Sequence, residues 1–248
     1  MQLVQMYHHF SQVLLQRKEA DGILLDCTKV SGRIPHDVIV DSHSKHGVTG
    51  RLLALFSDYL RGRSQRVMVD GYFSDDQPVK SGVPQGSVLG PTFFTVAVNS
   101  LSTCVKSTVL QYADDDVLHR TVSSKDDCRA PQEDLDNLAV WCRNSGLDIS
   151  SRKSQHLRIS NKKKKTEIPG GSYKFASDPI PAENEGECLG VTYSSRLDWT
   201  PRSIRQLENI QKKFLRSIRL SKMETTDSHD TDFIQYRQHL AEVQWLPL

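Results

Sequence analysis

Apolar residues recur at intervals of three and four in several segments of the chain, and this spacing predicts amphipathic helices. In residues 50–61, for example, Leu52, Leu55, Phe56 and Leu60 fall on one helical face. The predicted helices cover residues 2–17, 36–46, 50–61 and 125–144, with one more from about Thr92 and a long one from Pro201.

Short apolar or alternating runs between these helices predict strands. Ile23–Cys27 is an apolar run that ends in a carboxylate, Asp26. Residues 65–69 and 72–79 flank Asp70-Gly71, a strong signal for a β-hairpin. Further strands are expected at residues 109–110 and 117–118, which flank an acidic turn, and at 155–160 and 187–193.

The composition is typical of a folded globular protein, with 37% hydrophobic and 25% charged residues among 248. No apolar run approaches the roughly 18 residues that span a bilayer, and the first twenty residues lack the apolar core of a signal peptide. Five cysteines without close pairing argue for reduced thiols and against a zinc site. We therefore expect an intracellular protein, cytoplasmic or nuclear, without a membrane span.

Charge is distributed unevenly along the chain. Residues 143–222 hold 17 Lys and Arg against 8 Asp and Glu, a local charge of +9 that leaves −7 for the remainder. An acidic part followed by a basic part suggests a metal-collecting half and a half that faces a polyanion. The lysine run Lys162–Lys165 is by itself a solvated loop.

Three adjacent carboxylates, Asp114, Asp115 and Asp116, stand between short apolar runs. Side by side they repel one another, and a hard divalent cation such as Mg²⁺ would relieve that repulsion. The alternative is a solvated acidic turn. Asp26 has the same two interpretations, a metal ligand or an exposed aspartate at a strand end.

A glycine- and proline-rich string precedes the helix expected from Thr92. Three glycines and two prolines in residues 81–91 prescribe a particular backbone path. Glycines let a backbone approach a ligand closely, and a helix start offers free N–H groups to an anion. A loop with a purely structural role is the alternative.

The helix expected from Pro201 has two unlike sides. Apolar residues cluster on one side, and the basic residues on the opposite side are Arg205, Lys212, Arg216 and Arg219. Such a helix can pack on a core while it presents a basic stripe to a phosphate backbone. An ordinary surface helix would have the same pattern.

Taken together, these strings resemble the reverse transcriptase domain of non-LTR (LINE-type) retrotransposons. Residues 81–91 match that family's SGVPQGSVLGP loop at every position, and residues 112–115 match its YADD hairpin. Residues 24–29 with Pro35-His36 resemble its first catalytic strand, LDFSKAFDxVPH. Matches to the segments that follow are Leu138, Trp141, Gly146, Leu147, Lys153, Leu189, Gly190, Val191, Leu197, Trp199 and residues 244–248.

The resemblance implies an α+β fold, a polymerase right-hand palm in which helices flank an antiparallel sheet, with a partial fingers region and a helical thumb. Residues 1–185 would form the palm with its fingers remnant, and residues 186–248 the primer-grip hairpin and the start of the thumb. The implied activity is RNA-directed DNA polymerisation, in which a dNTP is joined to the 3′-hydroxyl of a DNA primer on an RNA template.

The resemblance also implies roles for individual residues. Asp26 and Asp114 would hold two Mg²⁺ ions, with Asp115 beside them and the main-chain carbonyl of Cys27 completing the second site. Two metals about 3.5–4 Å apart can activate the primer hydroxyl and stabilise the leaving pyrophosphate. The implied nucleotide, template and primer contacts are Ser31, Gln85, Gly86, Tyr112 and Lys153, and the implied duplex-backbone contacts are Arg205, Lys212, Arg216 and Arg219.

The chain also departs from the family pattern. Val30-Ser31-Gly32 stands where the family has Ala-Phe-Asp, and Asp116 stands where it usually has a neutral residue, so that the extra carboxylate is expected to misplace a metal. Little chain precedes Asp26 to form fingers strands, no endonuclease domain precedes it, and the chain stops within the Trp-Leu-Pro segment. We therefore expect a fragment of a decaying element, truncated at both ends.

Three hypotheses follow from the sequence. The first is an RNA-directed DNA polymerase domain, favoured by Asp26, Asp114 and Asp115. The second is a catalytically degenerate relic that only binds RNA or DNA, favoured by Ser31, Asp116 and the missing fingers. It would bind through Arg205, Lys212, Arg216, Arg219 and the Lys162–Lys165 run. The third is a chain that does not fold stably because its core lacks the fingers, which a broad, non-cooperative melt would support.

We expect weak discrimination against ribonucleotides in any polymerase activity, because Ser31 lacks the ring that in the family packs under the deoxyribose and excludes a 2′-hydroxyl. The measurement is a competition between dNTPs and rNTPs during primer extension. Strong rejection of rNTPs would count against this expectation.

Overall fold

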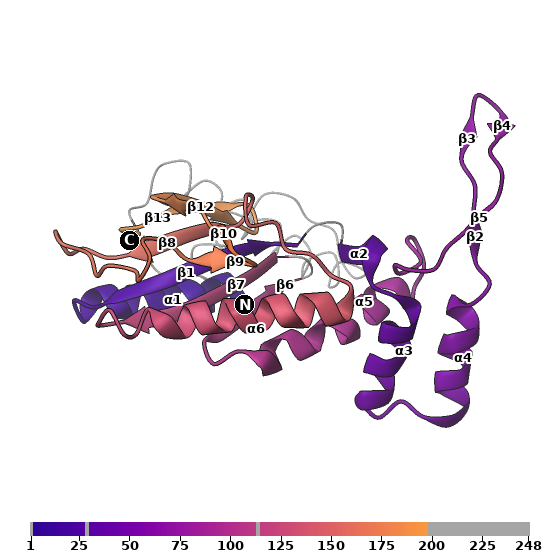
Figure 1. Ribbon diagram of the computed structural model, residues 1–248, viewed down its shortest axis with the longest axis horizontal. Coiled ribbons are helices and arrows are strands. Elements are labelled where there is room, and N and C mark those ends of the chain that lie inside the picture. The colour runs from indigo at the N-terminus through magenta and orange to yellow at the C-terminus, as the bar shows by residue number, and fades with distance from the viewer. Residues whose placement is uncertain (1, 28–29, 113–114, 198–248) are drawn as a thin grey trace, which may run out of the picture. The chain divides into compact units, whose positions relative to one another are not determined.

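Strand β1 (Glu19–Asp26) lies at the centre of a five-stranded sheet (Figure 1). The computed structural model describes residues 2–27, 30–112 and 115–197. The strand order is β11–β8–β1–β7–β6, with β6 at Thr108–Tyr112, β7 at Asp115–Val122, β8 at Gln155–Ile159 and β11 at Ala182–Glu183. Strand β1 is antiparallel to both neighbours, and within this sheet β11–β8 is the parallel pair.

Both faces of the sheet are covered, because the side chains of β1 alternate between two apolar cores. Ile23 and Leu25 belong to the larger core, which includes residues of helix α6 (Arg129–Ser145). Ala20 belongs to the smaller core, which includes residues of helix α1 (Gln2–Leu15). The predicted helices at residues 2–17 and 125–144 are thus confirmed, although α6 begins four residues later.

Three helices extend the larger core beyond the sheet: α3 (His36–Lys45), α4 (Gly50–Leu60) and α5 (Gly90–Val98), the last followed by the 3₁₀ helix η1 (Asn99–Cys104). The rings of His43, Phe56 and Phe93 join them, edge to face, at centroid distances of 5.0–5.3 Å. Leu52 and Leu55, which share the predicted helical face with Phe56 and Leu60, are 50% and 56% exposed. Of these four residues, Phe56 and Leu60 are buried in the larger core.

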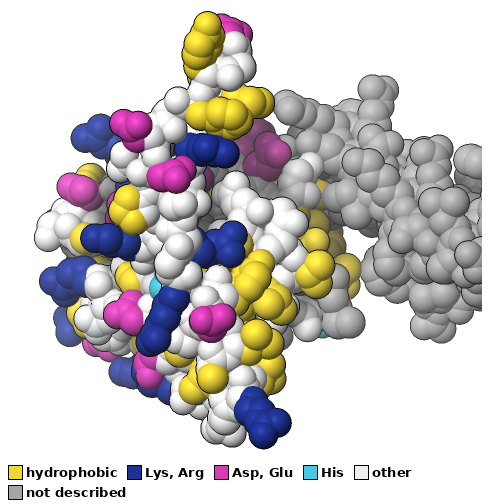
Figure 2. All heavy atoms as spheres, turned by 90° about the vertical axis from the view of Figure 1, so that its right-hand side faces the viewer, with side chains coloured by type: hydrophobic (Ala, Val, Ile, Leu, Met, Phe, Trp, Pro, Cys, Tyr) yellow, Lys and Arg dark blue, Asp and Glu magenta, His cyan; other side chains and the backbone are white. Residues whose placement is uncertain are grey.

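A narrow arm projects between α4 and α5 (Figure 1). Its paired segments are β2 (Ser64–Gln65) with β5 (Gln77–Pro78), and β3 (Met68–Val69) with β4 (Tyr72–Phe73). The predicted turn is confirmed, with both Asp70 and Gly71 at positive φ, of 50° and 83°. Apolar side chains of the arm are exposed, as the top of Figure 2 shows.

Residues 187–193 do not form the single strand that their local pattern predicts, because this segment is part of a hairpin, as the resemblance implies. Strand β12 (Glu185–Cys188) turns at Leu189-Gly190 and pairs with β13 (Val191–Ser194). Both turn residues have positive φ, 51° and 75°, which reverses the chain. Cys188 and Tyr193 pack in the smaller core. A second small hairpin pairs β9 (Lys174–Phe175) with β10 (Asp178–Pro179).

The larger core also contains a buried charged network around Asp21, which is 1% exposed. Its carboxylate accepts hydrogen bonds from His156 at 2.7 Å, from Nη2 of Arg158 at 2.9 Å and from the Tyr173 hydroxyl at 2.5 Å. Burial alone would raise the pKa of Asp21, but the hydrogen bonds and charges of His156 and Arg158 outweigh burial and lower the pKa. Each charge in the network thus has a partner, which makes its burial tolerable.

The described residues belong to one compact unit. The predicted thumb helix and its basic residues Arg205, Lys212, Arg216 and Arg219 lie outside the described residues, and the division at residue 185 stays a prediction. None of the described helices combines the length and the apolar character that a bilayer span requires. All five cysteines, each within the described ranges, are free thiols, as the sequence predicts.

We expect the free energy of unfolding to fall by about 2–3 kcal/mol between pH 7.5 and 4.5 because of His119. Burial, and then the neighbouring charge of His9, lower its pKa from 6.5 to about 4. The fold therefore favours the neutral ring, and its stabilisation is complete above pH 6.5 and lost as the pH falls toward 4. Urea unfolding of wild type and of His119→Phe, which cannot titrate, measures this loss.

The exposed His46 supplies the matched control. His46→Phe should keep the full pH dependence, whereas His119→Phe should remove most of it. Equal pH dependence in wild type and His119→Phe would contradict the assignment.

Candidate active site

Two of the predicted metal ligands lie directly opposite each other at one end of the sheet. Asp26 is the last residue of β1, Asp115 is the first of β7, and the two are partners in the antiparallel ladder. The Asp26 side chain is 43% exposed, and Asp115 is exposed. Like charges at directly opposite positions destabilise a sheet unless a cation lies between them. The pair thus has the accessibility and the donor chemistry of a cation site.

Two other predicted site residues join this pair. Tyr112 ends β6 opposite Asp115 and is 61% exposed. The Lys153 ammonium lies 3.8 Å from a carboxylate oxygen of Asp26 and is 67% exposed. The ammonium partly offsets the negative charge at the end of the sheet.

Asp114 lies outside the described residues. Within the described ranges, no three His, Cys, Asp or Glu side chains form a metal-binding group. Hard oxygen donors such as Asp26 and Asp115 suit Mg²⁺, which usually binds through one or two carboxylates and keeps several waters. The two described carboxylates therefore fit this ion.

The third residue of the acidic run, Asp116, lies on the other face of β7. It is opposite Leu25, is 4% exposed, and accepts a hydrogen bond at 3.5 Å from the Cys27 thiol. Burial, and then the Asp116 charge, raise the pKa of the Cys27 thiol well above its usual range, which keeps it protonated as a donor. Because adjacent strand residues point to opposite faces, Asp116 does not share the face of Asp26 and Asp115. The position of Asp116 therefore does not support the expectation that its carboxylate misplaces a metal on that face.

The glycine-rich loop packs on the segment that follows Asp26 along the chain. The Gly82 N–H donates to the Ile34 carbonyl at 2.8 Å, and Ser81 forms a β-bridge with Pro35. Gly82, at φ 85°, lies so close to Gly32 that a Cβ there would be 2.8 Å from the Gly32 Cα. These contacts place the loop beside the short helix α2 (Val30–Arg33), which contains Ser31.

The two residues predicted to line template and nucleotide, Gln85 and Gly86, are exposed in the turn of this loop. Gly86 has a φ of 75°, and nothing lies within 4 Å of the position of a Cβ. The glycine-rich string therefore combines one glycine required by packing with one in open space.

The lysine run lies at the other end of β1. Lys162 places its ammonium 3.7 Å from Glu19, the first residue of that strand. At about 3.3 Å per residue, this is roughly 23 Å along the strand from Asp26. Lys163–Lys165 are exposed in a segment without helix or strand, as predicted. The run is therefore separate from the carboxylate site.

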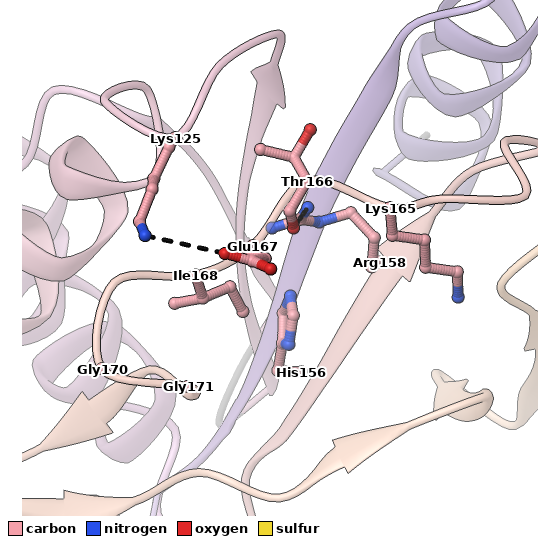
Figure 3. Close-up of a pocket in the computed structure, with 9 residues that line it drawn as sticks. All are labelled: Lys125, His156, Arg158, Lys165, Thr166, Glu167, Ile168, Gly170 and Gly171. Carbon is pink, nitrogen blue, oxygen red and sulfur yellow. Dashed lines mark hydrogen bonds and ion pairs between the residues drawn. The ribbon is translucent and has the colours of Figure 1, made fainter.

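A cavity of about 540 Å³ is lined by residues that include Lys125, His156 and Glu167 (Figure 3), and it lies on the face of the sheet opposite to that of Asp26. Its lining includes His156, which is paired with Ile23 in the β1–β8 ladder, three residues before Asp26, and so points to the other face. Lys125 and Glu167 form an ion pair of 3.7 Å across it. The side chains of His156 and Arg158 are already engaged by Asp21. This cavity is distinct from the carboxylate site.

Sequence reasoning missed the residues that hold Asp26 in place. The main-chain N–H of Asp26 donates to Ser154 Oγ at 3.1 Å, and its carbonyl accepts from the Ser150 N–H at 2.9 Å. Ser154 directly follows Lys153, which was predicted, but a serine in a turn has no distinguishing pattern by itself. The adjacency to Lys153 was the one available signal.

The chain is similar to known polymerases over most of its length. The family described as Reverse transcriptase (RNA-dependent DNA polymerase) matches residues 3–193. The RNA-directed DNA polymerase from mobile element jockey of Drosophila melanogaster is 29% identical over 216 residues, which are 83% of this chain and 23% of that protein. The probable RNA-directed DNA polymerase from transposon BS of the same species is 26% identical over 210 residues, 78% of this chain and 22% of that protein. The chain thus spans less than a quarter of the length of these relatives.

Solved structures of similar fold include telomerases of Candida Tropicalis. Apo telomerase truncated from its C-terminal domain has a TM-score of 0.56 and 14% identity, covering 79% of this chain and 39% of that one. The telomerase in complex with a fragment of telomeric RNA has a TM-score of 0.55 and 14% identity, covering 81% and 33%. At this identity the likeness shows the fold, and it confirms the predicted α+β palm.

We expect Gly82→Ala to destabilise the protein more than Gly86→Ala. Both positions have left-handed φ, which costs an alanine about 1–2 kcal/mol, and at Gly82 the added methyl also clashes with the Gly32 backbone, at a further cost of about 1–3 kcal/mol. Urea unfolding followed by circular dichroism measures the difference. Equal losses of stability would show that the loop does not pack against Gly32 in solution.

Proposed function

Because the chain belongs to the reverse transcriptase (RNA-dependent DNA polymerase) family, and within it is a LINE-type domain, we propose that it catalyses RNA-directed DNA polymerisation. The observation that supports this most directly is the opposition of Asp26 and Asp115 at an exposed end of the sheet. The proposed reaction joins a dNTP to the 3′-hydroxyl of a DNA primer on an RNA template and releases pyrophosphate.

Two Mg²⁺ ions are the proposed cofactors. Asp26, Asp114, Asp115 and the main-chain carbonyl of Cys27 would hold them, since the carboxylates supply hard oxygen donors and their mutual repulsion favours a bound cation. When bound, the ions would lower the pKa of the primer hydroxyl and stabilise the leaving pyrophosphate. No nucleophile from the protein is required.

The other site residues would bind and orient the substrates. The exposed ammonium of Lys153, only 3.8 Å from Asp26, can bind the triphosphate close to the carboxylates. The exposed ring of Tyr112, opposite Asp115, can pack on the primer end. Gln85, Gly86 and Ser31 would contact the template and the incoming nucleotide.

We assign the subdomains of the polymerase to successive parts of the chain. Residues 1–185 would form the palm with a fingers remnant, and residues 186–248 the primer grip and the beginning of the thumb. Arg205, Lys212, Arg216 and Arg219 of the thumb would bind the phosphate backbone of the RNA–DNA duplex without reading its sequence.

Primer extension with the purified chain tests the proposal. We expect Mg²⁺-dependent dNTP incorporation on a primed RNA template, and a loss of about 10³-fold in Asp26→Asn and in the double variant Asp114→Asn, Asp115→Asn, since metal ligation is worth several kcal/mol in the transition state. Asp116→Asn is the matched control, because that carboxylate lies on the other face and asparagine can still accept from Cys27. It should stay within about tenfold of wild type.

Two outcomes would contradict the proposal. The first is incorporation that survives the loss of Asp114 and Asp115. The second is no incorporation by a folded chain that still binds the primed template in a salt-sensitive way, which would identify a nucleic-acid-binding relic.

A further inference from the structure

The pairing of strand β1 with β8 stops just before the end of β1 that holds Asp26. The β1–β8 ladder ends at Leu24 and Gln155, so Asp26, two residues further on, has no partner residue in β8. In place of a strand, residues 151–153 form a turn. The hydroxyl of Ser154 accepts the Asp26 N–H at 3.1 Å, and thus takes the place of a main-chain carbonyl in the interrupted ladder.

The turn holds both main-chain polar groups of Asp26. The Ser150 N–H donates to the Asp26 carbonyl at 2.9 Å. The turn is also closed on itself, because the N–H groups of Ser154 and Lys153 donate to the Ser150 carbonyl at 2.9 Å and 3.2 Å. A displacement of Ser154 would therefore move Asp26 and Lys153 together.

Burial separates the roles of these residues. The Ser154 side chain is fully buried, whereas those of Asp26 and Lys153 are 43% and 67% exposed. The hydroxyl of Ser154 therefore lies beneath the carboxylate site and cannot reach a substrate. Ser154 can therefore affect the reaction only by fixing where Asp26 lies.

We propose that Ser154 is a positioning residue for the metal-binding carboxylate of Asp26, and that residues 150–154 fix the spacing between this carboxylate and Lys153. The inference rests on the proposed function, since it assigns Asp26 to the metal. Groups that orient metal ligands typically contribute about 10- to 100-fold to metal affinity or activity. A hydrogen bond to the main chain of the ligand residue acts in the same way as one to its side chain, because both fix where the carboxylate oxygens lie.

Three variants isolate the hydroxyl. Ser154→Ala removes the acceptor, Ser154→Thr restores it, and Ser151→Ala is the matched control, a buried serine in the same turn that does not hydrogen-bond to Asp26 in the described part of the chain. Mn²⁺ affinity is measured by electron paramagnetic resonance titration, which needs no turnover. Primer extension at varied Mg²⁺ and thermal melting are measured on the same preparations.

We expect Ser154→Ala to weaken Mn²⁺ binding and to lower kcat by about 10- to 100-fold, with a raised Mg²⁺ requirement. Ser154→Thr should recover most of both, and Ser151→Ala should match wild type. The proposal is overturned if Ser154→Ala binds Mn²⁺ as wild type does, or if Ser151→Ala shows the same loss, because the effect would then be a general loosening of the turn.

Hydrogen exchange of the wild-type protein keeps the proposal testable if Ser154→Ala does not fold. The Asp26 amide should exchange as slowly as its neighbours Leu24 and Leu25 in β1. Fast exchange at Asp26 alone would overturn the proposal.

Failure of the proposed function is distinguishable from failure of this inference. If the wild-type protein incorporates no dNTP but binds Mn²⁺ more tightly than Ser154→Ala does, the polymerase assignment is contradicted and the positioning role is supported. A protein that polymerises with unchanged rate in Ser154→Ala would do the reverse.

Discussion

The structure depends on the register between β1 and β7, because side chains in a strand alternate with a period of two. A slip of one residue would replace Asp115 by Asp116 opposite Asp26 and would turn Asp21 from its partners toward the core around α1. The buried bonds of Asp21 to His156 and Arg158 of β8 and to Tyr173 hold β1 in place and oppose a slip of β1 itself. Removing one partner of a buried ion pair costs about 3–5 kcal/mol, so the network makes the alternative register expensive.

The same register produces the charge repulsion of the candidate carboxylate site. It holds Asp26 and Asp115 directly opposite each other, where they repel. Lys153 relieves part of the repulsion from the turn that also holds the Asp26 main chain. Two ends of neighbouring strands and one turn of distant sequence thus form a site whose remaining negative charge a metal can neutralise. The buried Asp116 adds a third carboxylate but directs it into the larger core, toward Cys27.

Local patterns predicted the elements that depend on residues adjacent in the sequence. The Asp70-Gly71 turn formed because both residues adopt positive φ, and α3 begins directly after Pro35. The pattern alone did not decide which apolar residues are buried or where a short apolar run turns back on itself. Leu52 and Leu55 continue the apolar stripe of α4, yet only Phe56 and Leu60 of that stripe are buried, since the described neighbours of α4 cover one side of it. At residues 187–193 the apolar run concealed a turn at Leu189-Gly190.

The sequence by itself predicted the family, the α+β palm and the residue types of the candidate site. A long matching string such as Ser81–Pro91 is specific to one family, and the order of the family's motifs along the chain then predicts which residue types form the site. The tertiary structure alone decided which side chains meet. Ser154 lies 128 residues from Asp26, and Arg158 lies 137 residues from Asp21. No periodicity reaches across such separations, since the pairing follows from ladder register and from the burial of polar groups that must find partners.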